Sequence, residues 1–402
     1  MRSITDRYFR VGYLAFFLSV ITVPSSKSIS GVCLGIASLF FLISLFKKKK
    51  KDIPLIWHDR IFWAILFFCA LPFIGLLWTE DMKSGLTICR RISLVIITYL
   101  LCAYFLKDDE DKIKLLKALV IGVVVLNLLG LIKFFGIRNA KPFSLPSVVI
   151  MNPIWFGNVS AISLYASLVI FFLLKQGRRI WVLCSIINVL GIALSASRGP
   201  YLAALIVFGI VFLSTFLKEK RRIVFLLLIV IILGTVLFKS EFKQKVFAIN
   251  DEIKAFFLSS EVKSSIGARL GMWKLSFEMF KENPILGVGT GDYELEVARR
   301  AEGSWSFLKK YNQPHSIYFY FLALYGLIGI GVLFFLFFMW FKESLKRTKN
   351  FGVSKAFGIL GLAVGLHYLL AGFTETLFKI HILVFFFGVI AGVCFTKGKG
   401  GF

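Results

Sequence analysis

Long apolar segments recur from one end of this sequence to the other, and they constrain its fold more than any other feature. A helix that crosses the hydrocarbon core of a bilayer needs about 20 mostly apolar residues. The composition agrees, being 58% hydrophobic and 16% aromatic with a mean hydropathy of +0.81. A transmembrane barrel would instead show short segments of alternating polarity. We therefore expect an all-α integral membrane protein.

Charged clusters between the apolar segments predict how the helices cross the membrane. The lysine run 47–51 and other basic loops alternate with loops that carry few basic residues, as the positive-inside rule requires. This pattern predicts about twelve spans with both termini in the cytoplasm. Because the formal net charge of +26 falls largely in these loops, we expect membrane lipids, and no nucleic acid, as partners. No clear cleavage site follows the first apolar run, 8–23, so we expect it to remain as span one.

The one long hydrophilic segment between two predicted spans is 239–314. We expect spans one to nine at 1–238, an external helical loop at 239–314, and spans ten to twelve with a cytoplasmic tail at 315–402. Two amphipathic stripes in the loop predict helices that lie on the bilayer, pack on the mouth of the bundle or form a small extramembrane cap. The stripes are Phe242, Val246, Ile249, Ile253 and Phe256, then Ile266, Leu270, Trp273, Phe277 and Phe280.

Local signals set the limits of the second amphipathic helix. Ser264 or Ser265 can cap its start, and Asn283 followed by Pro284 ends it. The glycine-rich stretch 287–291 then predicts a flexible turn. It lacks the setting of a dinucleotide-binding fingerprint, so we do not expect a nucleotide site there.

Three residues on the predicted external side can carry chemistry. Arg198 lies in the turn between spans seven and eight, where a charge faces a cavity or an anionic partner, or snorkels to lipid phosphate. Arg269 lies on the second amphipathic helix, where a solvated residue or a headgroup contact is the ordinary alternative. His315 begins span ten and can exchange a proton near neutral pH, although a histidine at a helix start is more often structural. Gly326 and Gly329 are expected to give its helix a small face for close packing.

Several motifs of known chemistry are missing from the sequence. There is no HExxH, no GxSxG and no P-loop, and the six cysteines are isolated, which predicts neither a metal site nor a disulfide framework. The first external loop, 25–30, has no carboxylate that could hold a metal beside a diphosphate. If the protein binds a diphosphate, we expect arginines to hold it, with no metal and no cofactor.

Three short motifs resemble motifs of a known protein family. One motif begins with His315 and Ser316 and continues, after nine residues, with Gly326 and Gly329, which two residues separate. This motif is similar to the signature of O-antigen ligases. The stretch 267–273, Gly-Ala-Arg-Leu-Gly-Met-Trp, is similar to the arginine motif of their large periplasmic loop, and 197–199, Ser-Arg-Gly, resembles their short arginine–glycine loop. With the same order and a large loop after span nine, the chain resembles the O-antigen ligase and polymerase superfamily of bacterial cell envelopes.

The resemblance implies a metal-independent, inverting glycosyltransferase with a GT-C-like fold in the bacterial inner membrane, its active site facing the periplasm. The donor would be a glycan on undecaprenyl diphosphate, and the acceptor a sugar hydroxyl of the lipid A-core oligosaccharide. By the same resemblance, Arg198 and Arg269 would bind the donor diphosphate and stabilise the leaving group. His315 would be the general base or would orient the acceptor hydroxyl.

Other residues and other functions stay open. Arg90 and Arg91 on span four, and Glu375 in the last external turn, are candidate auxiliary groups. An O-antigen polymerase would use a second lipid-linked glycan as its acceptor, and a protein glycosyltransferase of the superfamily is a further alternative. A polysaccharide flippase or other transporter would explain the spans and the intramembrane arginines, but not the large external segment, and transporters often show two related halves.

Overall fold

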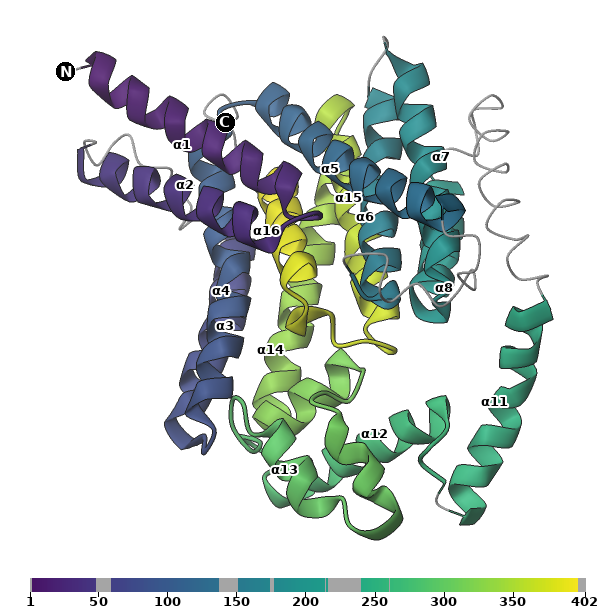
Figure 1. The fold of residues 1–402 in the computed structure, drawn as a ribbon. Helices are drawn as coiled ribbons and strands as arrows, with labels where there is room; N and C mark the ends of the chain where they lie inside the picture. Colours follow the sequence, from purple (N-terminus) through teal and green to yellow (C-terminus); the bar gives the residue numbers. More distant parts are fainter. Residues whose placement is uncertain are drawn as a thin grey trace.

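The computed structural model describes residues 2–47, 59–136, 151–173, 177–213, 215, 240–259 and 261–396. Every regular element in these ranges is a helix (Figure 1), so the predicted all-α class is confirmed. Eight helices within the described ranges are long and apolar enough to cross a membrane, and the chain is a multi-pass membrane protein. The predicted ninth span, 223–238, lies outside the described residues, so the total of about twelve spans stays a prediction.

The described helices fall into two bundle segments and the part of the chain between them. The first segment contains α1 (Arg2–Thr22), α2 (Lys27–Lys47), α3 (Arg60–Gly75), α4 (Met82–Phe105), α5 (Asp109–Gly136), α6 (Pro153–Leu173), α7 (Arg178–Ser195) and α8 (Arg198–Val207), with the 3-10 helix η3 (Leu76–Trp78) and the π-helix η4 (Phe208–Leu213). Between the segments lie α11 (Ser240–Ser259), α12 (Ser265–Glu282), α13 (Tyr293–Arg300) and η5 (Gly303–Lys310). The last segment contains α14 (Ile317–Thr348), α15 (Gly352–Ala371), η6 (Leu377–Lys379) and α16 (His381–Phe395).

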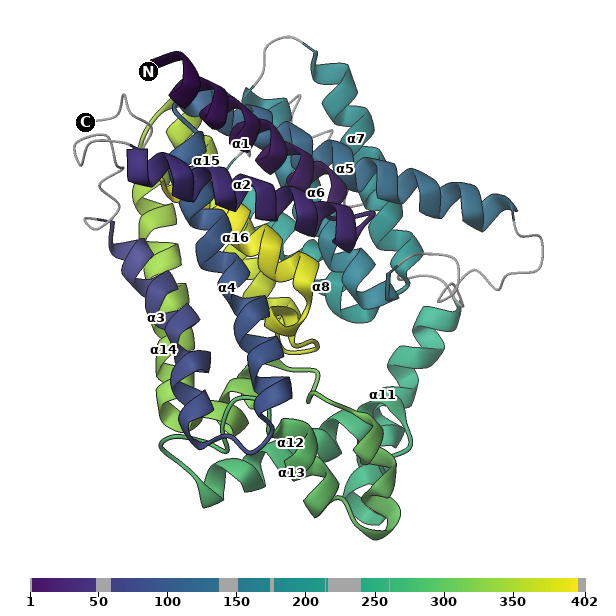
Figure 2. The ribbon, with the colours of Figure 1, turned by 60° about the vertical axis from the view of Figure 1, so that its left-hand side comes forward.

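Two helices form the centre of the bundle. α16 packs against α4, α5, α6, α14 and α15, and it is buried along its length from Ile382 to Phe395. α6 is buried from Phe156 to Ile170. A helix that is buried on every side carries apolar or small residues all round, which is why neither helix shows an amphipathic stripe. α1 begins and α16 ends on the same side of the molecule (Figures 1 and 2).

The elements α11, α12, α13 and η5 gather at the opposite end, beyond the ends of α3 and α4, and we call them the cap (Figures 1 and 2). All of them lie within the predicted loop 239–314. The start and end of α12 agree with the capping residues predicted from the sequence. Ser264 is its N-cap and accepts a hydrogen bond from the Gly267 N–H at 3.0 Å, and Asn283 is its C-cap.

The buried face of α12 differs from the predicted apolar stripe. Ala268, Met272, Leu275 and Met279 are buried, whereas the stripe residue Phe277 is 43% exposed. α12 packs through the face that carries its glycines, and a Cβ on Gly271 would lie 2.9 Å from Leu308 of η5. Small residues allow this close approach, so the face of α12 that packs within the protein carries small residues, and the predicted apolar stripe lies on another face. Phe242 and Val246 of the first stripe lie outside the residues whose side chains the structure describes.

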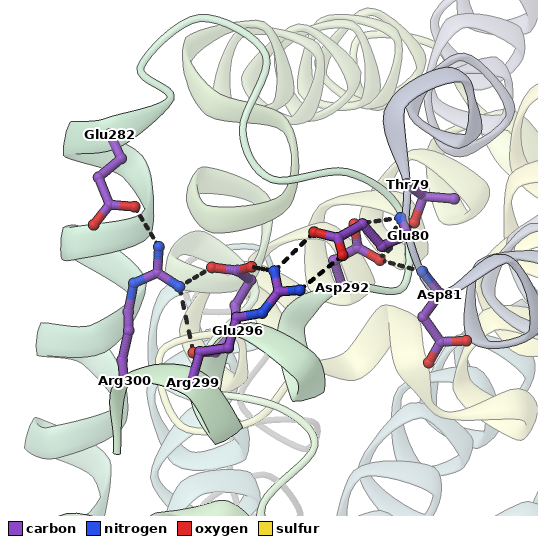
Figure 3. Close-up of polar contacts among 8 residues, drawn as sticks. All are labelled: Thr79, Glu80, Asp81, Glu282, Asp292, Glu296, Arg299 and Arg300. Atoms are coloured by element: carbon purple, nitrogen blue, oxygen red, sulfur yellow. Dashed lines mark hydrogen bonds and ion pairs between the residues drawn. The ribbon is translucent and has the colours of Figure 1, made fainter. Parts of the chain in front are cut away.

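A polar cluster joins the cap to the turn between α3 and α4 (Figure 3). Asp292, which is 2% exposed, accepts hydrogen bonds from the backbone N–H groups of Glu80 (2.9 Å) and Asp81 (2.7 Å). It also accepts one from the Thr79 hydroxyl at 2.7 Å. Arg299 binds both carboxylate oxygens of Glu80 at 2.7 Å. The cluster also contains Glu282, Glu296 and Arg300.

α14 is interrupted at Gly326, where φ is 57° and ψ is −146°. A Cβ at this position would lie 2.5 Å from the Pro284 carbonyl oxygen. Backbone groups freed by the break bond to the cap segment 284–289. On the α14 side, the Leu327 N–H donates to the Pro284 carbonyl at 2.9 Å. In the other direction, the Val288 N–H donates to the Ala323 carbonyl at 2.9 Å, and the Gly289 N–H donates to the Leu324 carbonyl at 3.0 Å.

One expectation from the sequence is confirmed here, and another needs correction. Gly326 lies in close contact with Pro284 and Ile285, as expected of a small packing position. Glycine is also required because only glycine readily adopts this backbone conformation. The stretch 287–291 is not a free turn, because it is bonded both to α14 and to α3. The Thr290 hydroxyl donates to the Pro72 carbonyl at 2.7 Å, and the Thr290 N–H donates to the Gly75 carbonyl at 3.2 Å.

Candidate functional site

The turn that leads into α14 places His315 in an unusual conformation. Its φ is 51°, a region that residues with a Cβ seldom adopt. The flanking backbone is held on both sides. Trp273 of α12 donates from its indole N–H to the Pro314 carbonyl at 3.0 Å, and the Ile317 N–H donates to the Gly372 carbonyl at 2.8 Å. The cap and the turn after α15 therefore fix the position of His315 together.

His315 is paired with Glu375, one of the predicted auxiliary residues. Its Nδ1 lies 3.1 Å from Glu375 Oε2, and the side chains are 21% and 1% exposed respectively. Glu375 Oε1 accepts hydrogen bonds from Gln313 Nε2 at 2.8 Å and from the Thr376 N–H at 3.0 Å. An ionised carboxylate can only accept hydrogen bonds, so this pairing places the ring proton on Nδ1. Nε2 is then the nitrogen available to accept a proton.

Arg269 lies on α12 one helical turn before Trp273, so both residues are on the side of α12 that meets the His315 turn. Its charge interacts with Glu375, Arg198 and Tyr311. Burial lowers the pKa of Arg269 from its ordinary value, Glu375 raises it and Arg198 lowers it. A guanidinium keeps its charge at neutral pH in spite of such a shift. Arg269 is therefore a half-buried cation beside the His315–Glu375 pair.

Arg198 begins α8, and the start of α8 lies against the same turn. A Cβ on the following residue, Gly199, would lie 2.1 Å from the Thr374 hydroxyl oxygen. The start of α8 thus touches the residue next to Glu375. Together with the electrostatic interaction between Arg198 and Arg269, this contact places the two arginines, His315 and Glu375 in one neighbourhood. They come from four separate segments of the chain.

The two arginines of α4 have different surroundings. Arg91 is half-buried and donates a hydrogen bond to the Lys379 carbonyl in η6. Lys379 in turn donates from Nζ to the Asn312 carbonyl, so the two cations connect α4 to the turn that carries Glu375 and to the segment before His315. Arg90 is exposed on α4 and lies within electrostatic range of Lys27.

A cavity of about 480 Å³ opens next to this group of residues. Its wall contains Lys27, Arg91, Lys379 and Gln313. Sequence reasoning missed Lys27, Lys379 and Gln313, because nothing in the local sequence marks them. The one available signal for Gln313 is that it lies two residues before His315.

The other described histidines have different environments. His367 is fully buried between α6 and α15, and its ring nitrogens lie 3.0 Å from the Tyr165 hydroxyl and 2.9 Å from Asn158 Oδ1. Both of its nitrogens are used within the bundle, so it has a structural environment. His381 begins α16 and lines the cavity. Among the described residues, no three His, Cys, Asp or Glu side chains are arranged to hold a metal ion.

The arrangement has two chemical capabilities. A histidine with an oriented ring and a free Nε2 can accept a proton from a bound hydroxyl. Two guanidinium groups beside it can bind a phosphate or diphosphate by charge-assisted hydrogen bonds. A base next to two guanidinium groups suits group transfer from a phosphate leaving group.

Part of the chain is similar to a known protein family. Residues 182–335 match the family model described as O-antigen ligase. This match supports membership of the O-antigen ligase and polymerase family. The matched region contains Arg198, Arg269 and His315, while Arg91 and Glu375 lie outside it.

An uncharacterised protein of Haemophilus influenzae is 25% identical over 288 residues, which cover 69% of each of the two sequences. Its description states no activity, so the chemistry is argued from the family and from the site. Similarity to the O-antigen ligase and polymerase family points to a membrane enzyme of the glycosyltransferase type. Such an enzyme acts on a lipid-linked glycan and a lipid acceptor.

Proposed function

We propose that this protein is an O-antigen ligase, which transfers a glycan from undecaprenyl diphosphate to a sugar hydroxyl of the lipid A-core in lipopolysaccharide biosynthesis. The observation that carries the proposal is the His315–Glu375 pair at 3.1 Å beside Arg269, whose charge interacts with both Glu375 and Arg198. A base and a diphosphate site are the two parts that this reaction needs.

Arg198 and Arg269 are assigned to the donor diphosphate. Negative charge grows on the phosphate oxygen as the bond from the sugar anomeric carbon breaks, and fixed guanidinium groups stabilise that charge. The half-buried position of Arg269 strengthens the effect, because a charge interacts more strongly where water is partly excluded. The proposal needs no metal or other cofactor, since the two arginines neutralise the leaving group.

His315 is assigned to the acceptor. Its Nε2 would take the proton of the acceptor hydroxyl while that oxygen forms a bond to the anomeric carbon, from the face opposite the leaving diphosphate. One carbon–oxygen bond forms and one breaks, the proton moves to His315, and undecaprenyl diphosphate leaves. Attack from the opposite face inverts the anomeric centre. Glu375 would keep the ring oriented and stabilise the imidazolium that forms, as an acidic partner does for other histidine bases.

The proposed location is the bacterial inner membrane, with the site on the periplasmic face and both termini in the cytoplasm. The distribution of basic loops supports this orientation. It is also supported by the cap, which lies at the end of the molecule away from the start of α1 and the end of α16 (Figure 1).

The test is a lipopolysaccharide gel of the source bacterium after deletion of the gene, with wild-type complementation as the control. A ligase predicts bare lipid A-core and glycan polymer that accumulates on its lipid carrier. Lipid A-core that carries a single repeat unit would instead identify an O-antigen polymerase. An unchanged ladder would contradict both assignments and would direct attention to a flippase or another transporter.

A further inference from the structure

The cavity of about 480 Å³ has a basic wall built from four parts of the fold. Lys27 comes from the start of α2, Arg91 from α4 and Lys379 from η6, while Gln313 comes from the segment before α14. No Asp or Glu belongs to the lining residues, all of which the structure describes. Three cations that surround a cavity without a carboxylate attract an anion.

The hydrogen bonds of these cations leave their charge available. Arg91 donates to the Lys379 carbonyl and Lys379 to the Asn312 carbonyl, so both donate to neutral backbone oxygens. Lys27 is exposed and within electrostatic range of Arg91, and Arg91 acts in the same way on Lys379. Like charges held near one another are costly, and a bound anion would relieve that cost.

Two atoms of lining residues need a partner. Gln313 Oε1 and His381 Nδ1 are buried, and neither has a hydrogen-bond partner among the described residues. Gln313 is only 9% exposed, and buried polar atoms are normally bonded. Both residues line the cavity. Gln313 Oε1 only accepts hydrogen bonds, so its partner would be a hydroxyl of the ligand and not an anionic oxygen.

The remaining wall is apolar. Met151, Trp155, Ile380 and Ile382 line the cavity together with the cations. An apolar wall with a few charged groups suits an amphipathic molecule better than a free inorganic ion. A phosphate attached to a sugar of a glycolipid has this combination of charge and apolar surface.

We propose that this cavity binds a phosphate group of the lipid acceptor, while Arg198 and Arg269 bind the diphosphate of the donor. The inference rests on the proposed transfer between two lipid-linked molecules. Gln313 connects the two parts, because it lines the cavity and donates to Glu375 Oε1 at 2.8 Å. A phosphate bound by Lys27, Arg91 and Lys379 would thus position the acceptor sugar next to the His315–Glu375 pair.

A binding experiment on the full-length protein in detergent tests the site without catalysis. The Tm of the wild type is measured with lipid A-core, with the same lipid after phosphatase treatment, and with phosphatidylglycerol. A ligand that binds the folded state raises Tm. We expect the intact lipid A-core to raise Tm more than either of the other lipids. In Arg91→Gln and Lys379→Gln this preference should be lost, whereas Lys83→Gln, an exposed cation elsewhere on α4, should retain it.

A kinetic experiment with the same variants identifies what the site recognises. Loss of one charge-assisted hydrogen bond should raise the KM for phosphorylated lipid A-core about tenfold to a hundredfold. The KM for the undecaprenyl-diphosphate donor should stay unchanged in Arg91→Gln and rise in Arg269→Gln. With the dephosphorylated acceptor, Arg91→Gln and wild type should have the same KM.

The failure of this inference differs from the failure of the proposed function. Equal Tm shifts with the three lipids, or an equal effect of Arg91→Gln on both acceptors, would overturn the phosphate site even if the wild type is an active ligase. A wild type that transfers glycan only to a second diphosphate-linked glycan would overturn the ligase assignment. In that case the cavity assignment holds if Arg91→Gln raises the KM for this second lipid, and it is overturned if the KM does not change.

Discussion

At the scale of single residues, His315 combines a strained backbone with an anchored side chain. A backbone conformation with φ 51° at a residue that has a Cβ lowers the folding stability by about 1–3 kcal/mol. The bonds from Trp273 and Ile317 to the Pro314 and Gly372 carbonyls and the pairing with Glu375 offset that cost. The ring is therefore oriented before any substrate binds, which is what a general base requires.

At the proposed phosphate site, we expect Lys379 to make acceptor binding depend on pH. Burial is the main reason that the pKa of Lys379 falls to about 8, with Arg91 lowering it as well and Glu294 and Glu375 raising it. Lys379 is thus charged below about pH 8 and neutral above. We expect the KM for a phosphorylated acceptor to rise as pH passes through this value, because the anion then loses one partner. The groups around Lys379 are Arg91, Glu294, Glu375, the ring of Tyr320, and in the cavity Lys27 and His381.

The variant Lys379→Gln tests whether the pH dependence of the KM comes from Lys379. Its KM for the acceptor should be raised at pH 7 and should show no inflection near pH 8. An inflection that persists in Lys379→Gln would assign the titration to another group, and the role of Lys379 would be wrong.

The candidate residues that the sequence revealed are those within short motifs. Arg198, Arg269 and His315 stand in local patterns that can be compared with a known family. Lys27, Gln313 and Lys379 have no such pattern, because their role depends on α2, α4 and η6 meeting in space. Glu375 could be named only as an auxiliary group, since its pairing with His315 joins residues that are 60 positions apart.

At the scale of elements, the break in α14 connects the helix that follows His315 to the cap. The segment 284–289 bonds to backbone groups on both sides of Gly326. In a membrane-embedded or buried helix such backbone groups need partners, and here the cap provides them. The break therefore couples the position of α12, and with it Arg269, to the start of α14.

Replacing Gly326 by alanine should disrupt this connection. Alanine is strained at φ 57° and ψ −146°, and its Cβ would lie 2.5 Å from the Pro284 carbonyl oxygen. We expect Gly326→Ala to lose about 2 kcal/mol of stability or more, measured as a lower Tm in detergent. Gly331→Ala on the same helix is the control, because no atom lies within 4 Å of its Cβ position. Equal Tm values for the two variants would show that the break is not under constraint.

The limits of α12 could be predicted from the sequence, but not its buried face. Ser264 and Asn283 are local signals, because a helix-capping residue acts on the residues next to it in the chain. Which face becomes buried depends on the partner surfaces, and here η5 requires the close approach that Gly271 allows. A periodicity count gives most weight to large apolar residues, so it selected the face that carries Trp273 and Phe277.

At the scale of the whole molecule, the site lies where the bundle meets the cap. Arg198 and Glu375 belong to the bundle segments and Arg269 to the cap, so the site is complete only when the two parts are joined. The sequence predicted the helical membrane class because long apolar segments have few alternatives. It did not predict the attachment of the cap, which depends on the buried Asp292 meeting a turn more than 200 positions earlier.

Asp292→Ala should loosen the cap from the turn between α3 and α4. Asp292 accepts hydrogen bonds from the backbone N–H groups of Glu80 and Asp81 and from the Thr79 hydroxyl. Its replacement by alanine leaves these donors without that partner. We expect faster amide hydrogen exchange at Glu80 and Asp81 and a lower transfer rate. The exposed residue Glu282 provides the control, and Glu282→Ala should leave exchange at these two amides unchanged. Protection retained in Asp292→Ala would mean that other contacts hold the cap.

The most direct test of the central proposal is the rate of glycan transfer by purified protein, with an undecaprenyl-diphosphate-linked glycan as donor and lipid A-core as acceptor. His315→Ala is expected to lower kcat by about 10²–10⁴-fold, while its Kd for the donor stays within about twofold of the wild type, because Arg198 and Arg269 remain in place. Glu375→Gln should have an intermediate rate, since His315 is retained but its ring is no longer held by a carboxylate. Transfer by His315→Ala at the wild-type rate would contradict the assignment of His315 as the base.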